Sequence, residues 1–400
     1  MKTYQILIAG GGAAGLSVAA SLKRRDASLT IAIIEPSETH VYQPGQTLVG
    51  RGVMSLEQLK RPTQTFIPPD VDWIKAAVTA FKPDTNEIDL DNGTTLAYEH
   101  LVVSLGLKLN LEGIEGLADT LGQNGVTSNY VTELSAYTWD QVQKLKTGRA
   151  LFTQPPMPIK CAGAPQKAMY LSCDYWLKEN RLSGVDVEFH NAGAVMFGVA
   201  DFVPVLESYI KKYGVKTCFS STLIRVDGPA KKAWLKQGDG SVEETTFDLL
   251  HVTPPQCAPD VVASSALANE AGWVDVDQKT LQHTRYSNVF SLGDVCSAPN
   301  AKTAAAVRKQ VPIVADNLLA ARKQQAMPGV YDGYGACPLT VEVGKVVLAE
   351  FGYGGSLKPS FPLDPRVPRS LYWWMKTTGF PWVYWNLMMR GREWLVKTSP

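Results

Sequence analysis

The chain has 400 residues, which is too long for one hydrophobic core of ordinary size, so we expect two or three domains. Hydrophobic residues make up 45% of the chain and charged residues 19%, a composition typical of globular proteins with a sizeable core. The formal net charge of +1 argues against nucleic-acid-binding proteins, which carry a strong basic surplus.

The start of the chain predicts no signal peptide. Met-Lys-Thr passes directly into the apolar run 4–9, which leaves no room for a charged region, an apolar core and a cleavage site. No stretch of 18 uncharged apolar residues occurs, so we expect no membrane-spanning helix. The six cysteines form no C-x-x-C and the chain has only five histidines, so we expect no metal site.

The first predicted element is a buried strand, "YQILIA" at 4–9, followed by the turn "GGGAAG" and a helix with an apolar face. Gly10, Gly12 and Gly15 match the G-x-G-x-x-G pattern of dinucleotide-binding turns in the required strand-turn-helix setting. Glu35 ends the next strand, where a carboxylate accepts hydrogen bonds from ribose hydroxyls and repels a 2′-phosphate. These residues predict a dinucleotide site, with a turn that only packs helix on strand as the alternative.

Two later segments resemble the FAD-binding elements of flavoproteins with two dinucleotide-binding domains. They are the strand and small-residue turn at 100–106, and the strand, Gly293-Asp294 pair and Ala-rich helix within 287–310. In that superfamily the Gly-Asp pair holds the ribityl and pyrophosphate region, although Asp294 taken alone fits a helix cap equally well. The residues expected to bind FAD are Gly10, Gly12, Ala13, Ala14, Gly15, Glu35, Pro36, Gln43, Ser104, Gly106, Gly293, Asp294, Lys302 and Thr303.

The superfamily's second glycine-rich turn is missing here. The strand predicted at 149–154 is followed by "PPMPIKCAGAP" at 155–165, and proline offers no N–H for cradling a pyrophosphate. The next strand, 185–193, ends without an acid that would bind ribose. We therefore do not expect NADH to be a substrate.

Cys161 lies in this proline-rich loop, just before a predicted helix. The helix N-terminus and the neighbouring Lys160 both favour its thiolate. The competing interpretation is a small buried residue that fills a turn. A second cysteine, Cys337, lies in a Gly/Tyr-rich loop before a strand near the C-terminus.

The runs "KCAGAPQKAMYL", "KTAAAV" and "YDGYGACPLTVEVGKVVLAEFGY" resemble the sulfide:quinone oxidoreductases, in particular the branch that includes the mitochondrial enzyme, over essentially the whole chain. The resemblance implies that Cys161 and Cys337 form a disulfide or a sulfur-bridged trisulfide beside the flavin. The resemblance also implies that hydrosulfide attacks the sulfur on Cys337 and that the Cys161 thiolate passes electrons to the flavin. On the same basis we expect the flavin to reduce a ubiquinone-type or menaquinone-type quinone, and the sulfane sulfur to go to sulfite, glutathione or another thiol.

Some family members carry a third cysteine ahead of the first redox cysteine, but residues 122–134 contain none. We therefore expect non-covalent FAD and release of one sulfur atom at a time. The resemblance also implies an α/β fold with two Rossmann-like domains, the FAD domain being split in sequence and the NADH-like domain degenerate. The expected domains are 1–112 and 273–330 for FAD, 113–272 for the second Rossmann-like unit with Cys161, and 331–400 for the C-terminal region.

After residue 366 the chain becomes rich in tryptophan and in cations, with Glu393 as the one acid. Such a composition is typical of segments that lie in the lipid headgroup layer. We expect two short amphipathic helices, 369–376 and 381–397, that make the protein a peripheral, monotopic membrane protein; an aromatic homodimer interface is the alternative. Phe351, Tyr353 and Phe380 are candidates, by position only, for the walls of a quinone site.

Two other functions remain open. A type II NADH:quinone oxidoreductase shares the fold, FAD and an amphipathic tail, but it needs the glycine turn that 155–165 replaces. A non-enzymatic flavoprotein that regulates a partner through its redox state would keep FAD without turning over sulfide.

Overall fold

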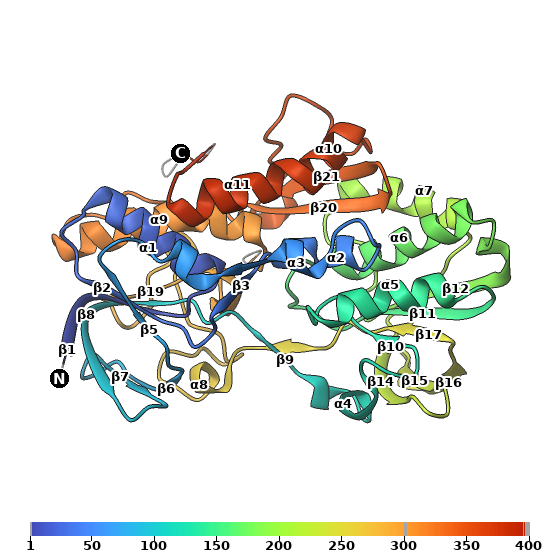
Figure 1. Cartoon of the computed structure of the whole chain (residues 1–400), viewed down its shortest axis with the longest axis horizontal. Coiled ribbons are helices and arrows are strands. Elements are labelled where there is room, and N and C mark those ends of the chain that lie inside the picture. The colour runs from blue at the N-terminus through green and yellow to red at the C-terminus, as the bar shows by residue number, and fades with distance from the viewer. Residues whose placement is uncertain (1, 300–301, 395, 397–400) are drawn as a thin grey trace.

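The computed structural model describes residues 2–299, 302–394 and 396, and Figure 1 shows them as two α/β units beneath a layer formed by the C-terminal segment. Lys397, one of the cations of the predicted tail, lies outside the described residues. None of the described helices has the combination of length and apolarity that crossing a bilayer requires.

The first unit is built on a seven-stranded sheet. Its strand order is β5 (Val71–Ile74), β2 (Ile31–Ile34), β1 (Lys2–Ala9), β8 (Thr95–Val103), β7 (Glu87–Leu90) and β6 (Val78–Lys82), with β19 (Val289–Ser291) also paired to β8. The strands β5, β2, β1, β8 and β19 are parallel. Residues 6–9 of the central strand β1 are apolar and lie in one core with helices α1 (Ala13–Arg25) and α9 (Ala304–Arg322), which contact each other.

The second unit holds a five-stranded, wholly parallel sheet. Its order is β10 (Val126–Thr127), β17 (Leu249–His251), β11 (Gly148–Gln154), β12 (Val185–Asn191) and β13 (Lys216–Phe219). Its helices are α5 (Leu134–Lys144), α6 (Ala164–Lys178) and α7 (Val203–Tyr213), and an antiparallel sheet of β14 (Thr222–Asp227), β15 (Lys232–Lys236) and β16 (Val242–Thr246) adjoins it. The predicted α/β class with parallel sheets is confirmed.

The hairpin of β20 (Gly335–Glu342) and β21 (Lys345–Phe351) follows α9 and packs on α6. Its alternating side chains face two ways. Cys337, Leu339 and Ala349 belong to the core of the second unit, whereas Ala336 belongs to the core of the first. The hairpin therefore ties the two units together and carries Cys337 to their boundary.

The C-terminal segment is one continuous helical run: α10 (Ser370–Trp374), a π-helical turn (Met375–Gly379) and α11 (Phe380–Asn386). The prediction of two helices separated at 378–381 is wrong. Pro381 stands in the first turn of α11, where its missing N–H is tolerated, and the wider π turn carries the chain through the expected break. The second predicted helix also ends early, since α11 stops at Asn386.

The remaining named helices and strands are short: β3 (Thr39–Val41), α2 (Gln46–Val49), α3 (Leu56–Leu59), β4 (Lys60–Pro62), β9 (Lys108–Leu109), α4 (Leu117–Thr120), β18 (Gln256–Cys257) and α8 (Asp260–Ala263).

Candidate active site

A cavity of about 500 Å³ lies between the two units and the C-terminal helical run. Twelve of the fourteen residues predicted to bind FAD line it. The two exceptions are Gly15, which is buried below the turn, and Pro36, which is exposed. The sequence pattern therefore located this cavity.

The glycine turn brings backbone rather than side chains to the cavity. Gly10 has a φ of +103°, a conformation that side chains disfavour. A Cβ atom at Gly15 would lie 1.8 Å from the Gly10 carbonyl oxygen, so only glycine lets α1 start this close to β1. The first turn of α1 is consequently open to an anionic ligand.

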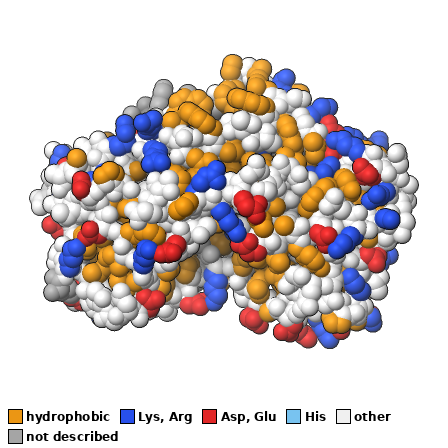
Figure 2. Space-filling view, in the orientation of Figure 1, with side chains coloured by type: hydrophobic (Ala, Val, Ile, Leu, Met, Phe, Trp, Pro, Cys, Tyr) orange, Lys and Arg blue, Asp and Glu red, His pale blue; other side chains and the backbone are white. Residues whose placement is uncertain are grey.

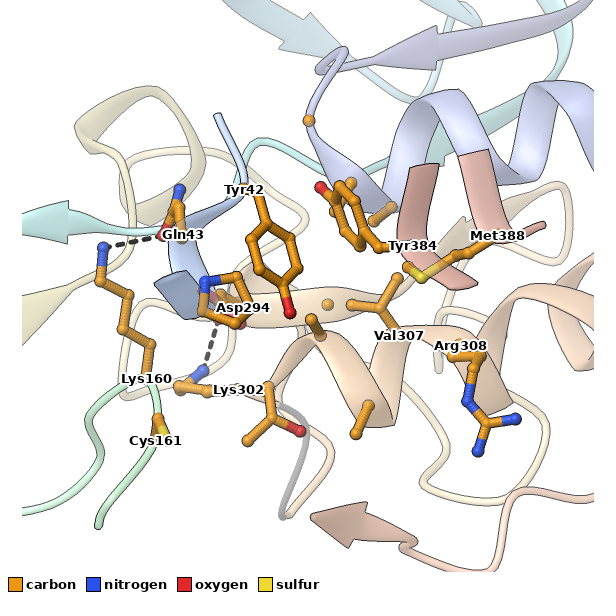
Figure 3. Close-up of a pocket in the computed structure, with 18 of the residues that line it drawn as sticks. Tyr42, Gln43, Lys160, Cys161, Asp294, Lys302, Val307, Arg308, Tyr384 and Met388 are labelled. Atoms are coloured by element: carbon orange, nitrogen blue, oxygen red, sulfur yellow. Dashed lines mark hydrogen bonds between the residues drawn. The ribbon is translucent and has the colours of Figure 1, made fainter. Parts of the chain in front are cut away.

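Charged groups from the predicted element at 287–310 and from the loop after β11 line another side of the cavity (Figure 3). Lys302 Nζ donates to the backbone oxygen of Asp294, and Lys160 Nζ donates to Gln43 Oε1 at 2.9 Å. Burial raises the pKa of the Asp294 carboxyl, and the Lys160 and Lys302 ammonium groups oppose that effect. Thr303 Oγ1 caps α9 by accepting a hydrogen bond from the Ala306 N–H at 3.0 Å, so the start of α9 faces the same cavity.

Two buried polar atoms in the cavity wall lack a protein partner among the described residues. They are Thr47 Oγ1 and Asn129 Oδ1. Buried polar atoms in folded proteins are nearly always hydrogen-bonded, so these two atoms fit a polar ligand. Together with the glycine turn, they make the residues present suited to a dinucleotide.

The two predicted redox cysteines meet at the inner end of this cavity. Cys161 Sγ and Cys337 Sγ are 3.3 Å apart although 176 residues separate them in sequence. Cys161 lines the cavity from the proline-rich loop, and Cys337 is 2% exposed. A Cβ on Gly163 would lie 2.7 Å from Cys337 Sγ, so this glycine makes the approach possible.

The electrostatics of the pair divide its two sulfur atoms into different roles. A hydrogen bond from Cys337 and another from Lys167 Nζ, at 3.2 Å, hold the pKa of Cys161 well below its usual range. The same contact with Cys161, together with burial, raises the pKa of Cys337 well above its usual range. Cys161 is therefore the thiolate and Cys337 the thiol of the reduced pair.

Besides Lys160, two further lysines place positive charge near the cysteines. Lys160 bonds to Gln43, whereas Lys167 on α6 contacts the sulfur directly. Lys376, from the C-terminal π turn, is 4% exposed and donates to the Pro44 carbonyl oxygen at 3.0 Å. Burial, and then the nearby Lys167, lower the pKa of Lys376 to about 7. The sequence held no local signal for Lys376, because the fold alone brings it to the cavity.

Of the three residues suggested for a quinone wall, the structure brings only Phe380 to the cavity. Phe351 points into the core of the second unit and packs against Phe197. Tyr353 donates from its hydroxyl to the Gln278 carbonyl oxygen. The apolar wall near Phe380 is completed by Pro338, Leu348 and Phe361.

Away from the cavity, Glu188, His190 and Cys218 place potential metal-ligating atoms within 4.8 Å of one another. Sequence reasoning missed this group because the fold, not sequence spacing, brings Cys218 beside the other two. Glu188 is already paired with Lys216 Nζ at 3.3 Å and with Arg149 Nε at 3.8 Å. Those cations balance its charge without a metal ion.

Comparison with known proteins gives matches along the whole chain. Residues 4–147 match the family model "Pyridine nucleotide-disulphide oxidoreductase". The chain is 40% identical over 390 residues to the mitochondrial sulfide:quinone oxidoreductase of Mus musculus, covering 97% of this chain and 87% of the mouse protein. It is also 40% identical over 398 residues to the mitochondrial enzyme of that name from Dictyostelium discoideum, covering 99% and 88% of the two chains.

Among solved structures, the sulfide:quinone oxidoreductase from Aquifex aeolicus superposes with a TM-score of 0.83 at 18% identity, covering 98% of this chain and 92% of that one. At this identity the superposition establishes the shared fold.

Proposed function

The chain belongs to the sulfide:quinone oxidoreductase family, and from that membership we propose that it oxidises sulfide to sulfane sulfur and passes two electrons to a quinone. The observation that carries the proposal is the pair of sulfur atoms 3.3 Å apart at the end of a cavity whose walls suit a dinucleotide. FAD, bound non-covalently, supplies the two-electron chemistry that joins thiols to a quinone.

The cysteine pair performs the sulfur chemistry. In the oxidised protein a disulfide joins Cys161 and Cys337, or one extra sulfur atom bridges them. Two S–S bonds of about 2.05 Å reach at most about 4.1 Å, so a bridging atom fits the observed separation of the Sγ atoms. In the disulfide form, hydrosulfide attacks the sulfur on Cys337, forms a persulfide there, and releases Cys161 as a thiolate. In the bridged form the same attack releases Cys161 as a persulfide, whose outer sulfur must go to an acceptor before the Cys161 thiolate is free. The attack is favoured because the leaving thiolate has the depressed pKa.

Lys167 holds the negative charge that this step creates. Its ammonium group donates to Cys161 Sγ at 3.2 Å and is itself buried, so water does not screen the contact. Sulfite, glutathione or another thiol then attacks the outer sulfur of the persulfide on Cys337. That transfer leaves Cys337 reduced and carries one sulfane sulfur atom away.

The quinone is expected at the apolar wall of the cavity, beside Phe361 and Phe380. The outer face of the same C-terminal segment exposes large apolar side chains, with Leu371 50%, Trp374 57% and Trp382 57% exposed. Figure 2 shows hydrophobic side chains gathered at the edge of the molecule that α10 and α11 occupy in Figure 1. A face of this kind suits a monotopic anchor, from which a lipid-soluble quinone enters the cavity without crossing water.

The test is coupled turnover in liposomes that contain a quinone. With sulfide and sulfite, we expect one quinol and one thiosulfate per sulfide consumed, and no quinol when NADH replaces sulfide. Quinol formation from NADH, or sulfide consumption without quinol, would contradict the proposal.

The anchor is tested separately by liposome flotation of a triple variant, Leu371→Asp, Trp374→Asp and Trp382→Asp. We expect this variant to lose flotation, whereas Val242→Asp, which changes an apolar side chain 52% exposed on β16, should float like the wild type. If the triple variant instead floats normally but changes from dimer to monomer, the face is a dimer interface.

A further inference from the structure

Glu350 is a buried carboxyl group that the sulfur chemistry does not use. It lies on β21 and is 3% exposed. Together with Leu348 and Phe361 it lines the cavity that holds the predicted FAD-binding residues, called the main cavity below. Glu350 Oε1 accepts hydrogen bonds from the Tyr334 hydroxyl and from Ser360 Oγ, the latter at 2.6 Å. Its Oε2 accepts from the Ser360 N–H at 2.9 Å.

A second hollow, of about 540 Å³, lies on the other side of these hydroxyl groups. Tyr334 and Ser360 line both this outer hollow and the main cavity. Ser360 and Asp332 are exposed at the wall of the outer hollow, which gives it contact with the solvent. The hydroxyl groups that bond to Glu350 therefore stand between the solvent and the apolar quinone wall.

The proposed reaction needs a proton at that wall. Sulfide near neutral pH is largely HS⁻, so one turnover combines HS⁻, a quinone and one H⁺ to give a quinol and one sulfane sulfur atom on the acceptor. The quinol receives two protons, and at least one of them comes from the solvent. Pro338, Leu348, Phe361 and Phe380 cannot carry a proton, so a polar group must bring it through the wall.

We propose that Glu350, together with the hydroxyls of Tyr334 and Ser360, delivers solvent protons to the quinone in the main cavity. This inference rests on the proposed function. A water in the outer hollow gives a proton through a hydroxyl group to the Glu350 carboxylate. Glu350 passes that proton to a quinone oxygen as the electron pair arrives, and the carboxylate is restored.

Charges from several elements face this group. Lys309 of α9 lies over the Tyr334 ring, with Nζ 5.1 Å from the ring centroid, and Arg308 of α9 acts electrostatically on Tyr334. Asp332 and Lys358, which pair at 2.7 Å, form part of the outer wall. Beyond β21, burial raises the pKa of Tyr372 on α10, the charge of Arg369 lowers it, and the charge of Glu350 raises it. Lys309 and Lys358 therefore place two cations in the wall of the outer hollow, which Tyr334 and Ser360 also line.

The experiment separates the quinone step from the sulfide step. Flavin reduced by dithionite is mixed anaerobically with a soluble quinone or with ferricyanide, which takes electrons but no protons. In Glu350→Gln we expect reoxidation by quinone to slow on the order of 10-fold to 100-fold, with a changed solvent deuterium isotope effect. Reoxidation by ferricyanide should match the wild type. A wild-type quinone rate, or an equal loss with both oxidants, overturns the inference.

Two milder variants and one control variant show whether a slower rate in Glu350→Gln comes from misfolding. Tyr334→Phe and Ser360→Ala each remove one hydroxyl, and each should slow only the quinone step, by less than Glu350→Gln. Glu342→Gln on the same hairpin, which pairs with Lys212 and Lys345, should leave both rates unchanged. If Glu350→Gln fails to retain FAD or melts early, the two hydroxyl variants decide, and wild-type quinone rates in both overturn the inference.

The same experiment separates a failure of the proposed function from a failure of the proposed role of Glu350. If sulfide does not reduce the wild-type flavin, the proposed function fails, but the dithionite experiment still reports on Glu350.

Discussion

The two α/β units place different chemistry at the same position of the same scaffold. After β1 the chain turns through glycines, with Gly10 at φ +103°, and offers backbone N–H groups to a ligand. After β11 it turns through Pro155, Pro156 and Pro158 and offers the side chain of Cys161, itself at φ +83°. The turn that follows a strand of a parallel sheet can therefore present either a bare backbone or a reactive side chain.

The two turns also differ in how much support they need from elsewhere. The motif of the glycine turn lies within the first 35 residues, where the Gly11 N–H donates to Glu35, and Ser104 supports it from the end of β8 by donating to the Gly10 carbonyl oxygen at 2.9 Å. The Cys161 loop depends on distant parts of the chain, since Cys337 comes from the hairpin and Lys376 from the C-terminal run. Local backbone chemistry can be recognised from a sequence motif, whereas assembled side-chain chemistry needs the fold.

The largest effect is expected from a substitution in the first turn, the glycine turn after β1. Gly15→Val places a side chain where a Cβ would already lie 1.8 Å from the Gly10 backbone oxygen and 2.8 Å from Ser104 Oγ. We expect nearly complete loss of bound flavin, measured as flavin absorbance per protein. Gly198→Val is the matched control, because a Cβ there meets nothing within 4 Å. Full flavin content in Gly15→Val would contradict this account of the turn.

The next effect comes from removing the positive charge beside Cys161 in the second turn. In Lys167→Met the pKa of Cys161 should rise, because the ammonium group that contacts its sulfur is removed. We expect flavin reduction by sulfide at pH 7 to slow on the order of 10-fold to 100-fold while flavin binding persists. The variant should recover as pH rises from 6 to 9, whereas wild-type cysteine chemistry changes little over that range.

Lys178→Met is the control for that experiment, since Lys178 lies at the far end of α6 and pairs with Asp174. A variant Lys167→Met with the wild-type rate and pH profile would show that Lys167 does not hold the thiolate.

The third prediction concerns protein stability and the charge that the second site buries. Burial lowers the pKa of Lys376 from 10.5 to about 7, so below pH 7 the folded protein carries a buried charge. Between pH 7 and 10.5 the unfolded chain binds more protons than the folded one, and wild-type stability therefore rises with pH. Lys376→Met should raise stability by at most about 5 kcal/mol below pH 7, and the gain should shrink at higher pH.

Thermal unfolding of the flavin-free protein at pH 6 and pH 8.5 measures this difference. Lys146→Met, at an exposed lysine, should give no gain at either pH. A gain in Lys376→Met that does not depend on pH would point to packing alone.

The same contrast explains what the sequence could predict. The strand, turn and helix around Gly10 and Glu35 follow from local patterns, and the cysteines were identified through resemblance to a family. Side-chain direction on β21 was not predictable without its register: Leu348 and Glu350 face the main cavity, so the alternation of a strand turns Phe351 to the opposite side.

The C-terminal segment escaped prediction for a different reason. Thr378-Gly379-Phe380-Pro381 indicates a helix break, but a π turn carries the chain through it without one. That turn is what places Lys376 in the cavity, so the error in secondary structure and the missed lysine have one cause. The contact of Lys167 with Cys161 was not predictable either, because a position on a helix gives no information about its distance from that sulfur.

The most direct test of the central claim is the flavin absorbance of the purified protein, mixed anaerobically with sulfide and separately with NADH, in wild type, Cys161→Ser and Cys337→Ser. We expect sulfide to bleach the wild-type flavin, with a transient long-wavelength band that neither variant shows. NADH should leave all three spectra unchanged. Bleaching by NADH that is indifferent to both cysteines would contradict the account and favour an NADH dehydrogenase.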